Sequence, residues 1–357
     1  MTLAVSVARV PGEPVAGRLE IGRRSLGPGE PVFIIAEACD NHLGDLETAK
    51  EMVRRAKWAG ADAIKFQHHL PDEEMLPDVP RSSNFDEPLY AFLKKHALRL
   101  EDHRVLKAYC DSLGMLYLCT PFSYQAAKEL NELRVVAFKI GSGEMTDIPS
   151  LLRIAAFGKP LLISTGMSTL EEIDETYQAL TQREATFGFM HCVSEYPPRY
   201  EDLNLDVIRV LQHRYPRLMI GHSDHTPDLY TAFAAVALGA CAIEKHIILD
   251  RRQRGPDQAV SITMEQLKDL VEGIRKIERS RGSEKRVHAL ERPIRAWAFR
   301  SVVAIQSIKA GQVITEQAVW TKRPGTGIPS KHLPEVIGRR AKRDIPVNTL
   351  LSWDDLE

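Results

Sequence analysis

The chain has 357 residues, of which 47 are lysine or arginine and 48 are aspartate or glutamate, so the formal net charge is −1. A chain of this length exceeds one average domain, and we expect one large domain with a smaller appendage. The balanced charge gives no net field that would attract nucleic acid or an anionic membrane surface, and it favours a small ligand that is recognised locally.

Export and membrane signals are weak in this sequence. The first residues, MTLAVSVARVPGEPVAGRLEIGRR, contain one short apolar patch without a basic lead or a clear cleavage site, and no stretch of about 18 apolar residues follows. The cysteines are odd in number, widely spaced and mostly inside apolar runs, as is typical of reduced, buried thiols: Cys39, Cys110, Cys119, Cys192 and Cys241. We therefore expect a soluble cytoplasmic protein with neither a disulfide framework nor a CxxC metal site.

Short apolar runs alternate with longer amphipathic stretches between residues 32 and 246, which is the pattern of repeated βα units. Several of the amphipathic stretches end at glycine, as a helix C-cap does. There are eight apolar runs: 32–37, 63–67, 115–120, 137–142, 160–165, 187–192, 218–223 and 241–246. Eight strands close a barrel, so we predict an α/β fold with a (β/α)8 TIM barrel, although a doubly wound sheet would also explain the alternation.

The pattern changes near the end of the predicted barrel domain, residues 32–281. Residues 282–299 form a charged segment with broken periodicity, which we interpret as a linker between domains. Residues 300–357 consist of short strand-like runs and turns around the loop KRPGTGIPS, and they predict a small β-rich domain that packs on a barrel, either its own or that of a partner. Residues 1–31 remain as an N-terminal extension, which we expect to cap the barrel.

Ionisable, amide or hydroxyl side chains occur at the ends of nearly all eight runs, and the carboxyl ends of barrel strands form the catalytic face of this fold. These side chains are Glu37, Lys65, Gln67, Thr120, Lys139, Ser142, Ser164, Ser223, His225, Glu244 and His246. Burying Lys65 and Lys139 without partners would cost roughly several kcal/mol, so each should meet an anion. The anion is either one ligand that both lysines share or a carboxylate such as Glu37 or Glu244.

Two histidines occur at the ends of neighbouring predicted strands. His225 lies in GHSDHT and His246 in EKH, and adjacent strand ends converge in a barrel. The pair therefore predicts part of a site for a divalent cation that keeps positions open for water and substrate oxygens, as a Lewis acid requires. The alternative is that either histidine is a hydrogen-bonded barrel residue, which is our interpretation of His191 and His222.

The segment FKIGSGEM, residues 138–145, joins Lys139 to a Gly-Ser-Gly turn whose backbone N–H groups and Ser142 hydroxyl can bind an anion. Tight turns use the same residues, so the segment alone is a weak signal. Further polar side chains are predicted on the same face, namely Lys65, Thr120, Ser164 and Ser223. The set predicts a basic, hydroxyl-lined pocket for a small molecule that carries both a carboxylate and a phosphate, and phosphoenolpyruvate is such a molecule.

Nine separated motifs follow one another from about residue 32 to residue 357: AEACDNHLGD, GADAIKFQ, CTPFS, FKIGSGEM, ISTGMST, SEYPPRYEDLNL, IGHSDHT, EKHIILD with RGPD, and KRPGTGI. In their order and content they resemble the signatures of the N-acetylneuraminate (sialic acid) synthase family. The resemblance implies a barrel followed by an antifreeze-like (SAF, β-clip) domain, in a domain-swapped homodimer. It also implies a transferase that condenses phosphoenolpyruvate with an amino-sugar aldehyde, such as N-acetylmannosamine, to give a 2-keto-3-deoxy nonulosonic acid and phosphate.

The resemblance also implies roles for individual residues. Phosphoenolpyruvate would contact Lys65, Thr120, Lys139, Ser142, Ser164 and Ser223. The acceptor sugar would contact Gln67, Asn84, Glu144, Tyr196 and Asp257, with Arg323 of the partner subunit at its N-acyl group. His225 and His246 would hold a divalent cation, Mn²⁺ first with Mg²⁺ or Co²⁺ as alternatives, and Glu37 would activate water. The catalytic set would then be Glu37, Lys65, Lys139 and His246.

The first motif departs from the usual family form at four positions. Residues 37–44 read Glu-Ala-Cys-Asp-Asn-His-Leu-Gly where Glu-Ile-Gly-Val-Asn-His-Asn-Gly is usual, so Cys39 adds bulk at a strand end and Asp40 adds a carboxylate near the acceptor. The donor residues are intact. The acceptor is therefore left open, as N-acetylmannosamine, a 2,4-diamino sugar of the legionaminic or pseudaminic type, a phosphorylated hexosamine or an unusual sugar.

Three other functions fit parts of the pattern. A metal-dependent hydrolase would use the histidine pair but would leave both pocket lysines without a role. An octulosonate- or heptulosonate-type synthase would share the chemistry, but such enzymes generally lack the C-terminal domain. A carbohydrate- or ice-binding module on an inactive barrel would not require the lysines, the histidines and Glu37.

Overall fold

The structure is a computed structural model, and it describes residues 17–80, 85 and 87–357. The chain divides into two compact units, one up to Arg281 and one from Gly282 to Glu357. Each unit has its own buried apolar core.

Eight parallel strands form the main sheet of the first unit, in the order β5-β4-β3-β10-β9-β8-β7-β6. They are β3 (Phe33–Glu37), β4 (Ala63–His68), β5 (Leu116–Pro121), β6 (Phe138–Ile140), β7 (Leu161–Ser164), β8 (Phe187–Cys192), β9 (Met219–Asp224) and β10 (Ala242–Ile248), and the short β11 (Ile262–Thr263) pairs with β10. The two ends of the order, β5 and β6, lie in contact, so the sheet curves into a nearly closed barrel. All eight predicted runs form strands, and the predicted TIM barrel is confirmed.

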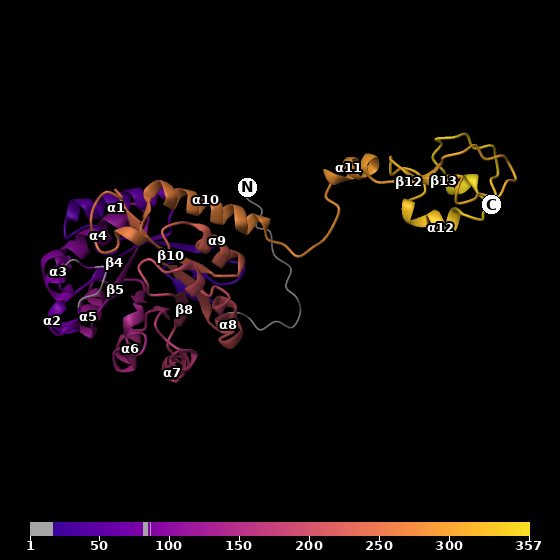
Figure 1. Cartoon of the computed structure of the whole chain (residues 1–357). Coiled ribbons are helices and arrows are strands. Elements are labelled where there is room, and N and C mark those ends of the chain that lie inside the picture. Colours follow the sequence, from indigo (N-terminus) through magenta and orange to yellow (C-terminus); the bar gives the residue numbers. More distant parts are fainter. Residues whose placement is uncertain (1–16, 81–84, 86) are drawn as a thin grey trace. The chain divides into compact units, whose positions relative to one another are not determined.

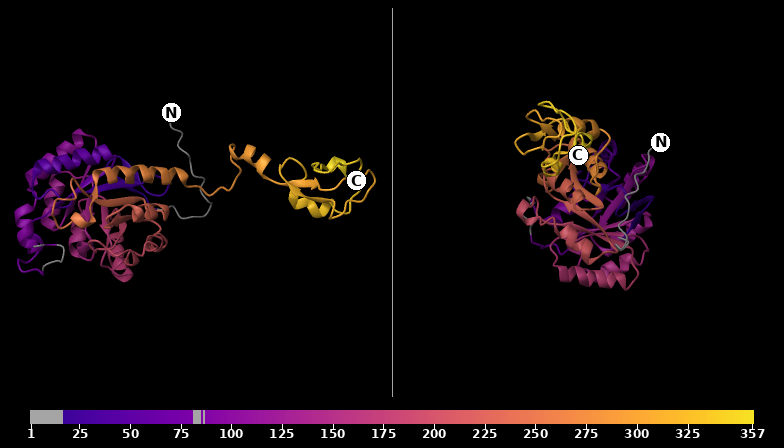
Figure 2. Two further views of the ribbon diagram at one scale, coloured as in Figure 1. Left: turned by 45° about the horizontal axis from the view of Figure 1, so that its top comes forward. Right: turned by 90° about the vertical axis from the view of Figure 1, so that its right-hand side faces the viewer.

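Helices surround the strands of the barrel (Figure 1). They are α1 (Leu46–Ala59), α2 (Pro71–Glu74), α3 (Leu89–His96), α4 (Leu100–Ser112), α5 (Tyr124–Glu132), η1 (Ser142–Glu144), α6 (Ile148–Ala155), α7 (Leu170–Thr181), η2 (Tyr200–Asp202), α8 (Val207–Arg214), α9 (Tyr230–Ala237), η3 (Gln258–Val260) and α10 (Met264–Ser280). Helix α10, orange in both figures, runs along the outside of the unit against α1 and α9 (Figures 1 and 2). The sequence sets the helix ends locally, because the Asp45 side chain caps α1 at Thr48 and Gly60 ends it with φ +90°.

A hairpin before the barrel closes its amino-terminal end. Strands β1 (Leu19–Ile21) and β2 (Arg24–Leu26) pair antiparallel, and Leu19, Ile21 and Leu26 are fully buried. They share one apolar cluster with residues at the starts of the barrel strands, among them Phe33 and Ala63. Burying large aliphatic side chains in this way stabilises the fold by about 1.5–3 kcal/mol for each.

The second unit is small and rich in short strands. Its elements are α11 (Glu291–Ala298), β12 (Ser301–Ala304), β13 (Val319–Lys322), η4 (Ser330–His332), α12 (Leu333–Val336) and η5 (Trp353–Asp355). Strands β12 and β13 are antiparallel, and Val302, Ala304 and Val319 from them enter a buried apolar cluster. Helix α11 lies inside the segment that we predicted as a linker, and its formation was not expected from the broken periodicity.

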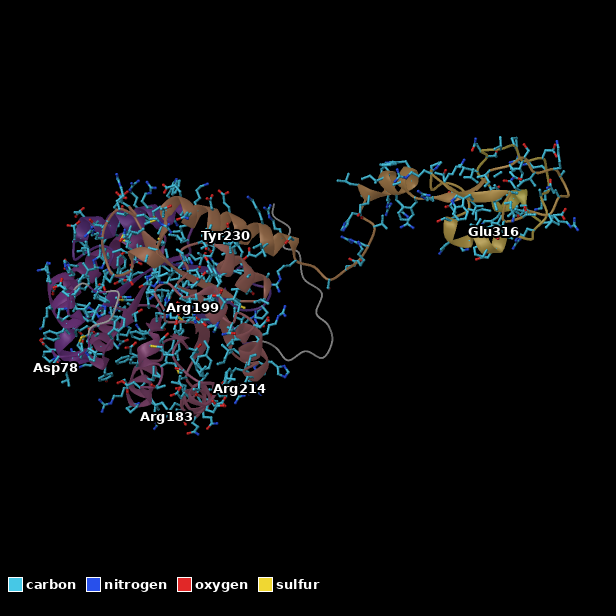
Figure 3. All side chains as sticks on the ribbon, viewed as in Figure 1. Asp78, Arg183, Arg199, Arg214, Tyr230 and Glu316 are labelled. Atoms are coloured by element: carbon cyan, nitrogen blue, oxygen red, sulfur yellow. The ribbon has the colours of Figure 1, made fainter. Side chains whose placement is uncertain are left out.

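Charged side chains of both signs cover the outside of both units, as Asp78, Arg183, Arg214 and Glu316 illustrate (Figure 3). This distribution agrees with the balanced composition. Among the described residues, no helix is both long enough and apolar enough to span a lipid bilayer.

Candidate active site

A cavity of about 470 Å³ opens at the carboxyl ends of the barrel strands. Thirteen of the predicted site residues line it: Glu37, Lys65, Gln67, Thr120, Lys139, Ser142, Glu144, Ser164, Tyr196, Ser223, His225, His246 and Asp257. Asn84 lies outside the described residues, and Arg323 belongs to the second unit. The residues that line the cavity come from all eight barrel strands or from the segments that follow them. The barrel thus brings together site residues that are up to about 220 positions apart in the sequence.

The two predicted lysines meet two carboxylates at the bottom of this cavity. Lys65 Nζ lies 2.8 Å from Glu37 Oε2 and 3.5 Å from Glu244 Oε1, and Lys139 Nζ lies 3.7 Å from Glu244 Oε1. Strand register brings these groups together, because Glu37 on β3 lies beside Lys65 on β4. The ion pairs that we considered as an alternative are therefore present, and they leave both lysines in the cavity wall.

The two carboxylates of this network differ in acidity. Burial raises the pKa of Glu37 to about 7, and neighbouring Glu244 adds to this effect while Lys65 opposes it. Burial acts on Glu244 in the same direction, but Lys139 and Lys65 outweigh it, and the pKa of Glu244 is lowered. Glu244 is therefore the permanent counter-charge of the lysines, and Glu37 is the group that can exchange a proton near neutral pH.

Hydroxyl groups surround the lysines. Lys65 Nζ donates to Thr120 Oγ1 at 2.9 Å, and Lys139 Nζ donates to Ser164 Oγ at 2.6 Å. Ser223 donates to Glu244 at 3.2 Å. These bonds fix the ammonium groups at the strand ends, and together the donors form a compact site for a small anion.

The Gly-Ser-Gly turn predicted to bind an anion lies beside this cluster. Ser142 begins η1, and its hydroxyl accepts a hydrogen bond of 3.1 Å from the backbone N–H of Gly166. A Cβ atom on Gly166 would lie 2.3 Å from Ser194 Oγ and 2.7 Å from Ser142 Oγ, so only glycine fits between the two serines. The turn is thus held against the cavity by a close backbone approach.

The two predicted metal-binding histidines lie next to each other. Their ring centroids are 5.0 Å apart, and the Tyr196 ring stacks on His225 at 4.3 Å. His225 Nδ1 donates to the Val193 carbonyl at 3.0 Å, which leaves its Nε2 as the nitrogen with a free lone pair. His246 Nδ1 is buried and has no hydrogen-bond partner among the residues that the structure describes. A buried nitrogen in this state fits a metal ligand, so these residues are suited to a divalent cation.

Two donors that we did not predict as ligands lie beside His246. The donor atoms of Cys39, His246 and Asp257 are all within 4.8 Å of one another, and all three residues are buried. The family resemblance implies Asp257 as a contact of the acceptor sugar, and the sequence indicates for Cys39 only added bulk at a strand end. The two histidines that we interpreted as barrel residues, His191 and His222, are structural, since His222 Nδ1 donates to the His191 carbonyl at 2.9 Å and neither lines the cavity.

The outer part of the cavity is rich in carboxyl groups. Asp40, Glu74 and Glu144 line it together with His69, which contacts Glu74 at 3.0 Å. Burial raises the pKa of Glu144 to about 7. The same wall contains apolar side chains from the excursion between β4 and α4, which sequence reasoning did not identify as part of the site: Met75, Phe85, Leu89 and Leu93.

Comparison with known proteins agrees with this geometry. The model that describes the NeuB family matches residues 52–286, which is more than half of the chain and most of the barrel. This chain belongs to the NeuB family. The model of the SAF domain matches residues 299–357, so the NeuB-family barrel is followed by a SAF domain, as the sequence predicted.

Several relatives of this NeuB-family protein are sugar-acid synthases. The chain is 37% identical to the N,N'-diacetyllegionaminic acid synthase of Legionella pneumophila over 94% of this chain and 98% of that protein. It is 35% identical to the human N-acetylneuraminate-9-phosphate synthase over 88% of both. Among solved structures, a sialic acid synthetase from Leptospira borgpetersenii matches with a TM-score of 0.70 and 31% identity, over 78% of this chain and 95% of that one. The chain is therefore an enzyme of the sugar-acid synthase type.

Proposed function

We propose that this enzyme condenses phosphoenolpyruvate with the open-chain aldehyde of an amino sugar, giving a 2-keto-3-deoxy nonulosonic acid and phosphate. The observation that carries the proposal is one cavity in which two buried lysines lie at the strand ends and two imidazoles lie beside them. The lysines match the donor, which carries a carboxylate and a phosphate. The imidazoles can bind a cation that lies beside the electrophilic carbonyl of the aldehyde.

The donor is held by Lys65 and Lys139 with the surrounding hydroxyl groups. Both ammonium groups are almost completely buried, with side chains 4% and 3% exposed, so their attraction for an anion is little screened by water. Glu244 balances part of their charge. The site therefore suits a multiply charged donor better than a neutral one, and it fixes the vinyl carbon in one orientation.

The acceptor aldehyde would lie between the histidines and the donor. A divalent cation held by His225 and His246, for which Mn²⁺, Mg²⁺ and Co²⁺ are candidates, supplies a Lewis acid that polarises the aldehyde when it is bound. Tyr196, stacked on His225, limits the position of the sugar from that side. The vinyl carbon of phosphoenolpyruvate then attacks the aldehyde carbon, and the new carbon–carbon bond leaves an oxocarbenium carbon next to the carboxylate.

Glu37 completes the reaction in this scheme. Water adds to the oxocarbenium carbon, and Glu37 takes the proton from that water, a role that its raised pKa of about 7 permits at neutral pH. The resulting tetrahedral carbon expels phosphate, so the carbon–oxygen bond of the donor breaks and its phosphorus–oxygen bond stays intact. Gln67 donates to Glu37 Oε1 at 3.0 Å and holds the carboxylate in place.

The acceptor is an unphosphorylated amino sugar in this proposal. Within the described residues, the outer wall of the cavity carries carboxyl groups on Asp40, Glu74, Glu144 and Asp257, which would repel a sugar phosphate and can accept hydrogen bonds from hydroxyl and N–H groups. Gln67, Tyr196 and the undescribed Asn84 would complete the contacts. A hexosamine should therefore be used at least about tenfold more efficiently, by kcat/KM, than its 6-phosphate.

We further propose a cytoplasmic, domain-swapped homodimer, in which Arg323 of the partner subunit reaches the acceptor. In the second unit, Arg323 lies over the Trp297 ring of α11 at 5.3 Å, and the apolar side chains of Leu290, Ile294 and Trp297 are not buried by that unit. An exposed apolar face of this kind is typical of an interface with another protein surface. Residue 323 would then be placed at a binding site rather than on a free surface.

Mixed dimers test the swapped arrangement. Arg323→Ala and Glu37→Ala should each lower activity, and dimers that contain one chain of each kind should recover one intact site of the two, about half of the wild-type activity per dimer, since one cavity then has both residues. A pair of variants within one unit, Glu37→Ala with Lys139→Ala, is the matched control and should show no recovery. Equal activity of the two mixtures would contradict the swap.

The reaction itself is tested with phosphoenolpyruvate, a divalent cation and a panel of aldoses. Phosphate release should require an aldose and should match the formation of a 2-keto acid one for one. With ¹⁸O in the bridging position of the donor, all label should leave in phosphate. Phosphate release without loss of the aldose, or hydrolysis of an acylated sugar without donor consumption, would contradict the proposal and favour a hydrolase.

A further inference from the structure

A thiol, an imidazole and a carboxylate meet at the edge of the cavity, which His246 and Asp257 line. The donor atoms of Cys39, His246 and Asp257 lie within 4.8 Å of one another, although the residues come from the turn after β3, from β10 and from the loop before η3. Each is at least nine-tenths buried. Among the described residues, this is the one group of three or more such side chains close enough to hold an ion.

The backbone of Cys39 is strained. Its φ is +41°, which is the left-handed region that glycine enters freely and that other residues enter at a cost of about 1–2 kcal/mol. Glycine is the usual family residue at this position, so the chain carries a Cβ and a sulfur atom where the fold alone would favour having neither. Strained backbone of this kind is common at active sites and ligand-binding sites.

The neighbouring imidazole needs a partner. His246 Nδ1 is buried without a hydrogen-bond acceptor or donor among the described residues. His225, whose ring is 5.0 Å from that of His246, already uses Nδ1 on the Val193 carbonyl, so its Nε2 is the atom left for a ligand. Three side chains with the chemistry of cation ligands thus converge at one point, and His225 lies outside this group of three with its ring next to that of His246.

We infer that Cys39 and Asp257 are ligands of the same divalent cation as the two histidines. The inference rests on the cation of the proposed function and adds a thiolate and a carboxylate to its site. Two anionic ligands would neutralise the charge of a dication, and a five- or six-coordinate ion would still keep positions open for the substrate.

The added sulfur changes which metal the site prefers. Thiolate ligands favour zinc, iron and cobalt, whereas sites made of oxygen with few nitrogens suit magnesium and manganese. The chain should therefore bind Zn²⁺, Co²⁺ or Fe²⁺ more tightly than Mn²⁺ or Mg²⁺, which differs from the Mn²⁺ that the family resemblance implied.

A second buried thiol provides a matched control. Cys192 lines the cavity, and its Sγ lies 4.0 Å from His225 Nδ1 and 4.0 Å from Ser194 Oγ. It does not belong to the cluster around His246. The two cysteines are therefore alike in burial and in distance to a histidine, and they differ in the ligand role assigned to them.

The test is a spectrum of the full-length protein, stripped of metal by a chelator and titrated with Co²⁺. The wild type should bind one equivalent per chain and show a near-ultraviolet charge-transfer band between thiolate and cobalt. Cys39→Ser should lose the band and bind Co²⁺ at least about tenfold more weakly, and Cys192→Ser should keep the band. Asp257→Asn should keep the band with weaker binding and shifted visible bands.

Two outcomes would overturn the inference: a wild-type cobalt protein without the band, or a band that Cys39→Ser retains. Cys39→Gly removes the thiol and relieves the left-handed backbone, so it checks that loss of the band does not come from a misfolded chain. The proposed synthase reaction fails separately, if the wild type consumes no phosphoenolpyruvate with any aldose. A cobalt site without the thiolate would leave that reaction in place and would refute only the role of Cys39.

Discussion

The inner and outer parts of the cavity are built in different ways. The inner part consists of two lysines, two glutamates and three hydroxyl groups, nearly all on or directly after barrel strands, and hydrogen bonds or ion pairs connect them. The outer part consists of residues on the turns, loops and short helices that follow the strands, such as Asp40, Glu74, Glu144 and Asp257. Strand register fixes the first set, and the path of each loop fixes the second. A barrel can thus keep one donor site while the acceptor site varies.

The largest effect is expected from the inner part. Lys139→Met removes a buried cation that Ser164 and Glu244 hold in place, so kcat/KM for phosphoenolpyruvate should fall by at least about 10³. Steady-state kinetics measure the fall, and calorimetry should show that donor binding is lost as well. Lys159→Met is the control, because Lys159 lies outside the cavity and donates to the Val135 carbonyl. A fall of less than tenfold would mean that the hydroxyl groups alone hold the donor.

A smaller effect is expected where the two parts meet. Glu37→Gln should lower kcat by about 10²–10³ and leave donor affinity nearly unchanged, because the variant cannot take a proton from water. Burial raises the pKa of Glu37, so the wild-type kcat should increase with pH as the carboxyl group ionises near neutrality, and the variant should lose this increase. A pH–rate profile of both proteins measures it. An identical profile in the variant would assign proton removal to another group.

The smallest effect on catalysis is expected in the outer part. Glu144→Gln should raise KM for the sugar about tenfold, with KM for phosphoenolpyruvate unchanged, because one charged hydrogen-bond acceptor is lost. Initial rates of the wild type and the variant, with each substrate varied in turn at a saturating concentration of the other, separate these constants. An increase in both would place Glu144 at the donor instead.

The same variant should stabilise the fold at high pH. Burial raises the pKa of Glu144 from 4.5 to about 7, so the folded state must ionise a carboxyl group that ionises more easily when unfolded. The resulting loss of stability is absent below pH 4.5 and complete above pH 7, where it amounts to at most about 3 kcal/mol. Glu144→Gln should therefore raise Tm at pH 8 and not at pH 4. Equal shifts at both values would point to packing rather than charge.

The contrast between the parts also explains what could be predicted from the sequence. Lys65, Lys139 and Glu37 lie within or at the end of apolar runs, and eight such runs imply a barrel whose strand ends converge, so their meeting could be foreseen. No comparable rule predicts which residues on loops will meet. The cluster of Cys39 and Asp257 depends on how two loops fold over β10, and the apolar wall of Phe85 and Leu89 depends on a long excursion after β4. Neither follows from periodicity.

The hairpin formed by β1 and β2 determines from which end of the barrel ligands can reach the cavity. Since Leu19, Ile21 and Leu26 fill the amino-terminal end of the barrel, the cavity of the described residues has its entrance at the opposite end, and the lysines lie beneath the carboxyl-rich wall. In the proposed reaction, phosphoenolpyruvate at the lysines would lie deeper in the cavity than the sugar at the carboxyl-rich wall. We therefore expect ordered binding with phosphoenolpyruvate first, and product-inhibition patterns in steady-state kinetics measure that order.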